Sequence, residues 1–274
     1  FAFNFSHDFS HDTVFANKKW NHWGYTLIYT LMGAHAESWK YRHVHSHHFA
    51  PNVEGFDSDL SITGLIRVVP GSELRWFHRF QHLYAPVAYM TYSLYWILIK
   101  DPVMLFRKEE KVQKDWAYHL SFWLQKLVYL TVILAIPLLF AKHSVFHVLG
   151  AFLLMHALQS LFLLFTFFMT HHVEGTHYPT TDSDGSIKES WVMNQVKSSN
   201  DMHPFSWWAN FLLGGFNNHI AHHLFPHIHH LFYPRLSVLL YQQLQAYGWT
   251  PNQTSYWGGV VSHLKFLKRM GSEA

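Results

Sequence analysis

The sequence contains no cysteine at all. A chain without thiols forms neither disulfides nor cysteine-ligated iron–sulfur clusters, and it cannot ligate haem through a thiolate. Charged residues are also scarce, since Asp, Glu, Lys and Arg make up 14% of the 274 residues and the formal net charge is only +3. Because no long basic run is present, nucleic acid is not an expected partner.

The chain also lacks internal repeats, low-complexity tracts and Gly/Ser-rich linkers. Its length suits one domain, or two at most, and we expect a single domain over residues 1–274. Neither a flavin nor a nicotinamide fingerprint is present, and no His-Pro-Gly-Gly element of the cytochrome b5 type occurs. No residue is therefore assigned to an organic cofactor.

Histidine, in contrast, is abundant. Of 25 histidines, eight fall into three short clusters that read HxxxH, HxxxHH and HxxHH: His7, His11, His43, His47, His48, His219, His222 and His223. Neutral imidazole is a common ligand for iron, zinc, copper and nickel. Eight imidazoles are too many for one ion and suit two, so the clusters predict a dimetal site.

The spacing within the clusters predicts which histidines share an ion. Residues i and i+4 lie on one face of a helix, so His7 can point into the same cavity as His11. The same holds for His43 and His47. On a regular α-helix His48 lies about 100° further round than His47, so it can reach a neighbouring ion.

Long apolar stretches separate the second cluster from the third. Residues 145–169 contain no charged side chain and are long enough to span a bilayer with tilt. Residues 120–140 form a second candidate, in which Lys126 lies near one end and can snorkel to the interface. Because only residues 141–144 join them, we expect an antiparallel hairpin. The alternative is a buried helix pair in a soluble core.

Two shorter stretches are not expected to cross. Residues 83–99 are rich in tyrosine and tryptophan, which favour the interface, and residues 24–34 are too short to span and are expected to dip in. The histidine clusters must lie on one side, so an even number of crossings separates them. Positive residues in the loop 100–114 and in the tail ending at Arg269 favour the cytosolic side. The sequence thus predicts an all-α integral membrane protein, with transmembrane helices and a cytosolic helical cap that holds the polyhistidine dimetal site.

The three clusters resemble the histidine boxes of the membrane fatty acid desaturase family, in particular its bacterial linoleoyl-CoA-desaturase-like branch, which is related to front-end desaturases. Residues 76–84, 170–176 and 222–228 are similar to further stretches of that branch. Front-end members usually have Gln where this chain has His219, so the position of the double bond does not follow from the resemblance. A His-Gln pair of the branch appears here as Asn194-Gln195.

The resemblance implies a reaction and its partners. Two iron ions would activate O2 and remove hydrogen from a long fatty acyl chain carried by CoA, acyl-carrier protein or a lipid, leaving a cis double bond. Reduction of O2 takes four electrons, of which the substrate gives two. A separate ferredoxin or cytochrome b5-type donor would give the others. The expected location is a lipid membrane, the bacterial inner membrane, with the metal on its cytosolic face.

The resemblance also implies two transmembrane helices before the first box, so we expect an amino-terminal part to be missing ahead of Phe1. The implied metal ligands come from all three boxes and from the Thr-His…Glu segment at the end of the last crossing helix: His7, His11, His43, His47, His48, His171, His219, His222 and His223. No catalytic residue beyond these ligands is assigned.

Other residues near the boxes have less direct roles. His45 and His172 are not expected to bind metal, because a neighbour of each fits the pattern better. His227, His229 and His230 are expected to support the ligands or the fold and not to touch the metal. Acids near the box-like segments could orient imidazoles through the second ring nitrogen, namely Asp8, Asp12 and Glu174.

Two sets of side chains admit two interpretations each. One set either lines an acyl tunnel or anchors the membrane interface: Trp39, Trp76, Trp207 and Trp208. The other either holds a phosphate-bearing headgroup or forms a solvated basic face: Arg42, Arg67, Arg75 and Arg79.

Other functions stay open at this point. An acyl hydroxylase or acetylenase would share every motif above. A zinc-binding membrane receptor or hydrolase, or a metal transporter, would also show histidines near a membrane. A transporter needs ligands along a path through the bilayer, but the long apolar runs contain only His147 and His156. Soluble carboxylate diiron proteins need two Glu-x-x-His pairs, and this chain has one, Glu174 with His177.

Overall fold

A computed structural model of the chain describes residues 1–60, 64–107 and 112–273. These residues are mostly helical, as predicted. The exception is one parallel pair of two-residue strands, β1 (Asp201–Met202) and β2 (Gln253–Thr254). The fold is therefore not strictly all-α, because this short pair joins two loops of the cap.

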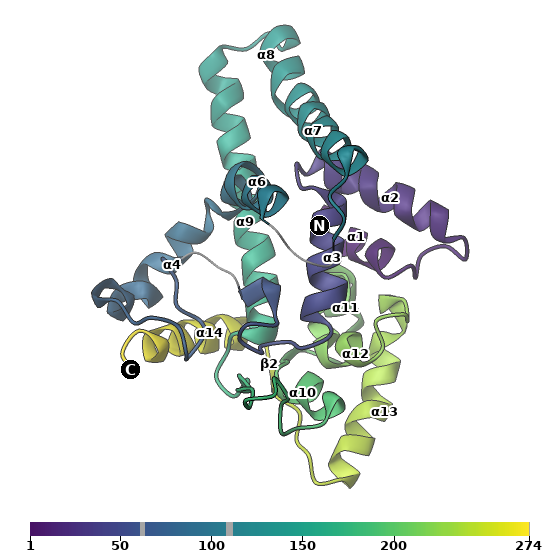
Figure 1. Cartoon of the computed structure of the whole chain (residues 1–274), viewed down its shortest axis with the longest axis vertical. Coiled ribbons are helices and arrows are strands. Elements are labelled where there is room, and N and C mark those ends of the chain that lie inside the picture. The colour runs from purple at the N-terminus through teal and green to yellow at the C-terminus, as the bar shows by residue number, and fades with distance from the viewer. Residues whose placement is uncertain (61–63, 108–111, 274) are drawn as a thin grey trace.

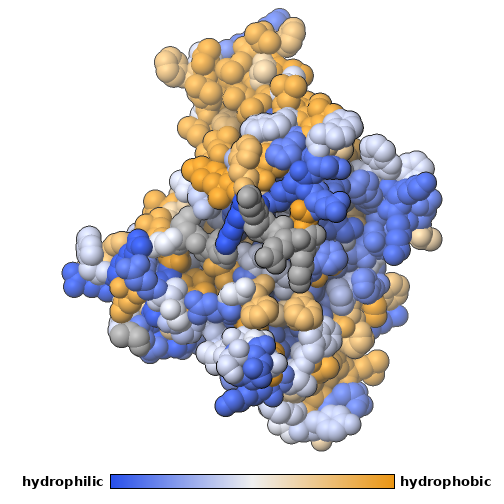
Figure 2. Space-filling model, viewed as in Figure 1, coloured by the Kyte–Doolittle hydropathy of each residue, from blue (hydrophilic) through white to orange (hydrophobic). Residues whose placement is uncertain are grey.

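A long helical hairpin projects from the rest of the molecule (Figure 1). Its first arm runs through α7 (Trp116–Leu130), the π-helical η5 (Thr131–Ala135) and α8 (Ile136–Phe140), and its second arm is α9 (Val145–His171). Both arms are long and apolar enough to cross a membrane. The surface of the projecting end is mostly hydrophobic (Figure 2), and Phe146 there is 86% exposed. The predicted hairpin of two long apolar helices is confirmed.

One prediction about this hairpin is wrong. Lys126 does not snorkel toward an interface but is buried, and its Nζ donates to Asp101 Oδ2 at 2.7 Å and to the Gly33 carbonyl at 2.6 Å. Asp101 is fully buried and also accepts hydrogen bonds from the Trp96 indole and the His35 backbone amide, both at 2.8 Å. A charged side chain in an apolar helix is stabilised by a partner of opposite charge, and here Asp101 is that partner.

The two shorter apolar stretches form shorter helices. Residues 24–34 belong largely to α2 (Lys18–Leu31), whereas residues 83–99 divide among α4 (Gln81–Tyr89), α5 (Tyr92–Tyr95) and the π-helical η4 (Trp96–Lys100), which runs into α6 (Asp101–Phe106). Within the described residues, only the hairpin arms qualify as membrane spans. Part of the basic loop 100–114, residues 108–111, lies outside the described residues.

The remaining helices surround the lower end of α9 (Figure 1). We call this part the cap. It comprises α1 (Ala2–Ser10), α3 (Ala36–Arg42), the π-helical η1 (His43–His47), α10 (Trp191–Lys197), α11 (Trp207–Leu213), α12 (His219–Leu224), α13 (Tyr233–Ala246), α14 (Tyr256–Met270) and the 3₁₀ turns η2 (Ser58–Leu60), η3 (Trp76–Phe80), η6 (Phe216–Asn218) and η7 (His230–Phe232).

The largest core cluster brings the three histidine boxes together. Phe3 of α1 packs edge-on against Trp39 of α3, with ring centroids 5.3 Å apart, and lies 6.0 Å from Phe216, just before α12. Met169 of α9 belongs to the same buried cluster. Buried aromatic rings of this size contribute strongly to stability, so the helices that carry the boxes are held side by side by the core next to them.

Candidate metal centre

The nine histidines predicted as ligands lie together in two groups. The five-histidine group contains His7, His11, His43, His48 and His222. The four-histidine group contains His47, His171, His219 and His223. In each group one ring nitrogen per residue lies within 4.8 Å of all the others, and all nine residues are buried. Each group can therefore hold one ion.

The first and third boxes follow regular helical spacing. His7 and His11 lie one turn apart at the end of α1 and belong to the same group. His219 and His223 likewise share the four-histidine group, with their Nε2 atoms 3.1 Å apart. His222 lies between these two in sequence and points to the other group, where its Nε2 is 2.9 Å from that of His48.

The second box departs from the predicted pairing. Of the two all-histidine groups, His43 lies in the one that contains His48, five residues on, whereas His47 lies in the other. The reason is local backbone structure: residues 43–47 form a π-helical turn, in which the His48 amide donates to the His43 carbonyl at 3.0 Å. A π-turn bonds residue i to i+5, so the fifth residue returns over the first. His47 is then directed to the four-histidine group.

In the four-histidine group, hydrogen bonds fix which ring nitrogen carries the proton. The Nδ1 of His171 lies 2.9 Å from the Ser198 carbonyl, which only accepts, so Nδ1 must donate. For the same reason His47 Nδ1 donates to Asp57 Oδ2 at 3.0 Å. His223 Nδ1 donates to Gln195 Oε1 at 2.8 Å. The orientation of this amide follows from its other end, where Gln195 Nε2 donates to the His48 carbonyl.

Because these rings carry their proton on Nδ1, their Nε2 atoms are unprotonated, and the Nε2 lone pairs point toward one another. The Nε2 of His171 lies 3.0 Å from that of His47, 2.6 Å from that of His219 and 3.2 Å from that of His223. Neutral rings that donate through Nδ1 have no hydrogen at Nε2, so these contacts cannot all be hydrogen bonds. A cation at their centre removes the repulsion. Two ligands at right angles on one ion, each about 2.1 Å from it, lie about 3 Å apart, which matches these contacts.

The five-histidine group has similar contacts and unsatisfied atoms. His43 Nε2 lies 2.7 Å from His7 Nε2 and 3.0 Å from His48 Nε2. Both ring nitrogens of His11 are buried without a hydrogen-bond partner among the described residues. Buried polar atoms normally have a hydrogen-bond partner, so the two unpartnered nitrogens of His11 indicate that this ring binds a metal ion. Both groups thus fit metal ions by geometry and by donor type.

Burial keeps most of these imidazoles neutral, as metal binding requires. Loss of solvent lowers the pKa of His7 to about 3 and lowers the pKa of His43, His48 and His222 well below its usual value. At His47 burial also lowers the pKa, but the Asp57 carboxylate outweighs burial and raises it. An ion bound at Nε2 would replace the second proton of that ring.

The three acids predicted to orient imidazoles of the boxes do not do so. Asp8 is hydrogen-bonded to His230, Asp12 pairs with Lys40 at 3.7 Å, and Glu174 pairs with Arg269 at 3.2 Å. Asp8 lies in α1, whereas Asp12 and Glu174 lie in turns that follow α1 and α9, and all three carboxylates bond to these other partners.

The groups that orient the ligands come instead from segments between the second and third boxes and from α13, which follows the third box. They are Asp57 for His47, Ser198 for His171, Gln195 for His223 and the Tyr233 hydroxyl, 3.1 Å from Nδ1 of His222. The sequence offered two signals for these residues: the Asp57-Ser58-Asp59 segment, which begins ten residues after His47, and Gln195 in the Asn194-Gln195 pair.

The other histidines named in the sequence analysis belong to neither of the two groups. His45 is exposed, and His172 Nδ1 bonds to the Tyr178 hydroxyl. His229 and His230 both contact Asp8, and His227 contacts the His11 carbonyl.

The arginines and tryptophans also fall into distinct environments. Arg42 and Arg67 are buried, whereas Arg75 pairs with Glu73, so these three do not form one basic face. Arg79 lies over the Phe80 ring. Of the four tryptophans considered for an acyl tunnel, Trp39 is buried, and the other three are 52–78% exposed: Trp76, Trp207 and Trp208.

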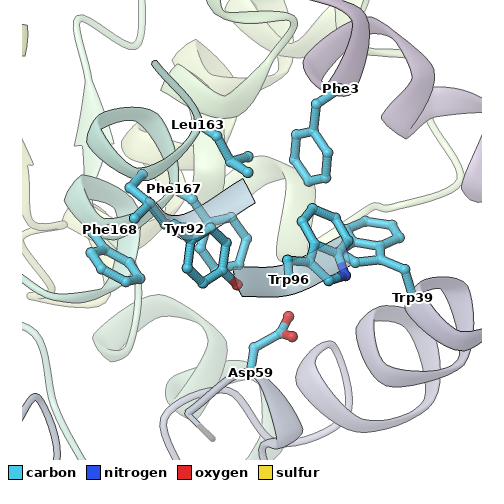
Figure 3. Close-up of a pocket in the computed structure, with 9 residues that line it drawn as sticks. Phe3, Trp39, Asp59, Tyr92, Trp96, Leu163, Phe167 and Phe168 are labelled. Carbon is cyan, nitrogen blue, oxygen red and sulfur yellow. The ribbon is translucent and has the colours of Figure 1, made fainter. Parts of the chain in front are cut away.

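The structure contains an apolar cavity with a mostly aromatic lining (Figure 3). Its walls come from α1, α3, α9 and the 92–100 segment, with Asp59 as the one acid: Phe3, Trp39, Asp59, Tyr92, Trp96, Leu163, Leu164, Phe167 and Phe168. Trp39 stacks on His43, with ring centroids 4.3 Å apart, and the Phe167 ring lies 5.7 Å from that of His47. The same side chains therefore contact the cavity and both histidine groups.

Comparison with known proteins agrees with this geometry. A family model described as fatty acid desaturase matches residues 1–255. An acyl-lipid (8-3)-desaturase of Physcomitrium patens is 31% identical over 80% of this chain and 47% of its own length. An sn-1 linoleoyl-lipid 6-desaturase of Arthrospira platensis is 28% identical over 98% of this chain and 74% of its own length.

The chain thus spans about half the length of the Physcomitrium patens relative and about three quarters of the Arthrospira platensis one. A probable Delta(5) fatty acid desaturase C of Dictyostelium discoideum is 28% identical over 99% of this chain and 61% of its own length. The family match covers all three boxes and the hairpin. The chain belongs to the fatty acid desaturase family.

Proposed function

We propose that this chain desaturates a long-chain fatty acyl substrate with O2 at two iron ions. The nine histidines would be the ligands, five for one ion and four for the other. The observation that carries the proposal is the set of lone pairs in the four-histidine group, which face one another beside an apolar cavity. Relatives named as fatty acyl desaturases support the reaction class.

The cavity would hold the acyl chain next to the metal centre. Its aromatic and aliphatic walls exclude water and bind an alkyl chain by burial of apolar surface. Trp39 and Phe167 contact ligand imidazoles on one side and the cavity on the other, so they would set the position of the reacting carbons. The relatives named for acyl-lipid and linoleoyl-lipid substrates favour a lipid-linked acyl group over CoA or acyl-carrier protein.

Iron, when bound, would supply the redox chemistry that activates O2. Zinc has no redox chemistry, so a zinc-loaded site could not carry out this reaction. The nine histidines would hold the ions through Nε2 while the outer hydrogen bonds keep the rings in place. The two electrons that the substrate does not provide would come from a separate ferredoxin or cytochrome b5-type protein.

Metal analysis tests this proposal directly. We expect protein purified under anaerobic conditions from iron-supplemented cells to contain about two iron ions per chain, because two separate groups of imidazoles are present. Elemental analysis with a colorimetric assay for ferrous iron measures this. Protein that contains a single zinc ion and no iron would contradict the oxygenase proposal and favour the zinc-binding alternatives.

We also propose that the hairpin crosses the membrane and that the cap lies on the cytosolic face. The absence of native cysteine allows a simple test. Ser183, in an exposed loop of the cap, and Ser144, at the exposed tip of the hairpin, are each replaced by cysteine. We expect an impermeant thiol reagent to label Ser183→Cys from the cytosolic side only and Ser144→Cys from the opposite side only. Labelling of both from one face would exclude a membrane-spanning hairpin.

A further inference from the structure

The two histidine groups differ in the hydrogen-bond acceptors at the Nδ1 atoms of their rings. In the four-histidine group, three rings donate through Nδ1 to fixed oxygen atoms of Asp57, Ser198 and Gln195. The Asp57 carboxylate is 4% exposed and is itself held by the backbone amides of Asn52 and Asp59, both at 2.9 Å. A full negative charge therefore stands at a fixed position behind His47.

The five-histidine group has no such charge at hydrogen-bond distance. Within the described residues, the nearest carboxylate is that of Asp59, whose Oδ2 lies 3.6 Å from His43 Nδ1. The Nδ1 atoms of His43 and His48 are buried without a hydrogen-bond partner there. His222 faces only the neutral hydroxyl of Tyr233.

This difference has a consequence for the bound ions. A carboxylate that accepts the Nδ1–H of a ligand imidazole makes that ring a stronger electron donor to the metal. A metal ion with stronger donors loses an electron more easily. We infer that the two iron positions are electronically inequivalent, and that a one-electron oxidation of the diferrous pair takes the electron from the ion of the four-histidine group.

The inference rests on the proposed function, because it takes iron as the metal. In the test reaction, one equivalent of ferricyanide accepts the electron and becomes ferrocyanide. One ferrous ion becomes ferric, and the other ion is unchanged. The charge behind His47 then balances the added positive charge on the ferric ion.

Mössbauer spectroscopy of the full chain loaded with iron-57 tests the inference. We expect two quadrupole doublets of equal area in the anaerobic diferrous protein. Asp57→Asn should shift one doublet only, and in wild type the same doublet should disappear after one equivalent of ferricyanide. Asp59→Asn is the matched control, because it removes a neighbouring carboxylate that bonds to no ring, and it should shift neither doublet by a comparable amount.

A second variant leaves Asp57 unchanged, so it tests the inference even if Asp57→Asn disturbs the folding of the Asp57 loop. Gln195→Glu places a carboxylate behind His223 in the same group. We expect it to lower the potential at which the four-histidine ion is oxidised, whereas Asp57→Asn should raise that potential. Asp57→Asn should also weaken the binding of one of the two ions by about 10- to 100-fold.

Three results would overturn the inference: equal shifts of both doublets in Asp57→Asn, loss of the unshifted doublet on oxidation, or shifts of potential in the same direction in both variants. Desaturation is scored separately on the same preparations. A protein that binds two irons without desaturating contradicts the proposed function, while its doublets still decide the inference.

Discussion

His47→Ala and His222→Ala are each expected to abolish desaturation and to lower the bound iron by at least half. His47 belongs to the four-histidine group and His222 to the five-histidine group, so each change removes one ligand from a different ion. Both rings are buried among the other ligands of their groups. Iron content and product formation, measured on the same purified samples, check this prediction.

His45→Ala is the matched control from the same box. His45 is exposed on the π-turn between two ligands and contacts the Tyr41 ring, so its loss should leave iron content and activity close to wild type. If His45→Ala loses iron as completely as His47→Ala, the assignment of the second box is wrong. Thermal unfolding of all three variants separates loss of metal from loss of fold.

The second large effect concerns the fate of the oxygen atoms. With O2, a reductant and a one-electron carrier, we expect two vicinal hydrogens to leave a long acyl chain and a cis double bond to form. The oxygen then leaves as water, so an incubation under ¹⁸O-labelled dioxygen should give a main product without label. Mass spectrometry of the acyl products measures both the loss of two hydrogens and the absence of label.

The same incubation decides between the functions that share the histidine boxes. A labelled alcohol as the dominant product would identify a hydroxylase, and a triple bond would identify an acetylenase. An incubation without the electron carrier is the control, because the substrate supplies only two of the four electrons that O2 needs. Product formation at the full rate without any external donor would contradict the proposed electron balance.

The sequence allowed the hairpin and the set of clustered histidines to be predicted, because both are local patterns. A run of 25 residues without a charged side chain predicts a long apolar helix from the sequence alone, without knowledge of tertiary contacts. Spacings of four residues in the first and third boxes likewise follow from regular helix geometry. The second box did not obey this rule, since a π-turn pairs His43 with His48, and the letters His-Val-His-Ser-His-His carry no sign of that turn.

The rest of the site depends on contacts between distant segments. Gln195 reaches both His48 and His223, and Asn52 bonds to the carbonyls of His171, His177 and Ser198. No spacing rule relates such residues. The acids that were predicted to orient ligands lie nearby in sequence, but the helices and turns that hold them direct their carboxylates to other partners. Proximity along the chain was therefore a poor guide to proximity in space.

The buried Asp101 has a consequence for how the protein is assembled. Its carboxylate accepts hydrogen bonds from Lys126 of the hairpin, from Trp96 beside the cavity and from the backbone of His35, which caps the helix that leads into the second box. Lys126 is costly in an apolar environment until that carboxylate is next to it. On the proposed placement in a bilayer, the first arm of the hairpin can settle only once residues 96–101 have docked against it. Insertion of the hairpin and completion of the metal-binding cap would then be one cooperative event, in which neither part reaches its final position before the other.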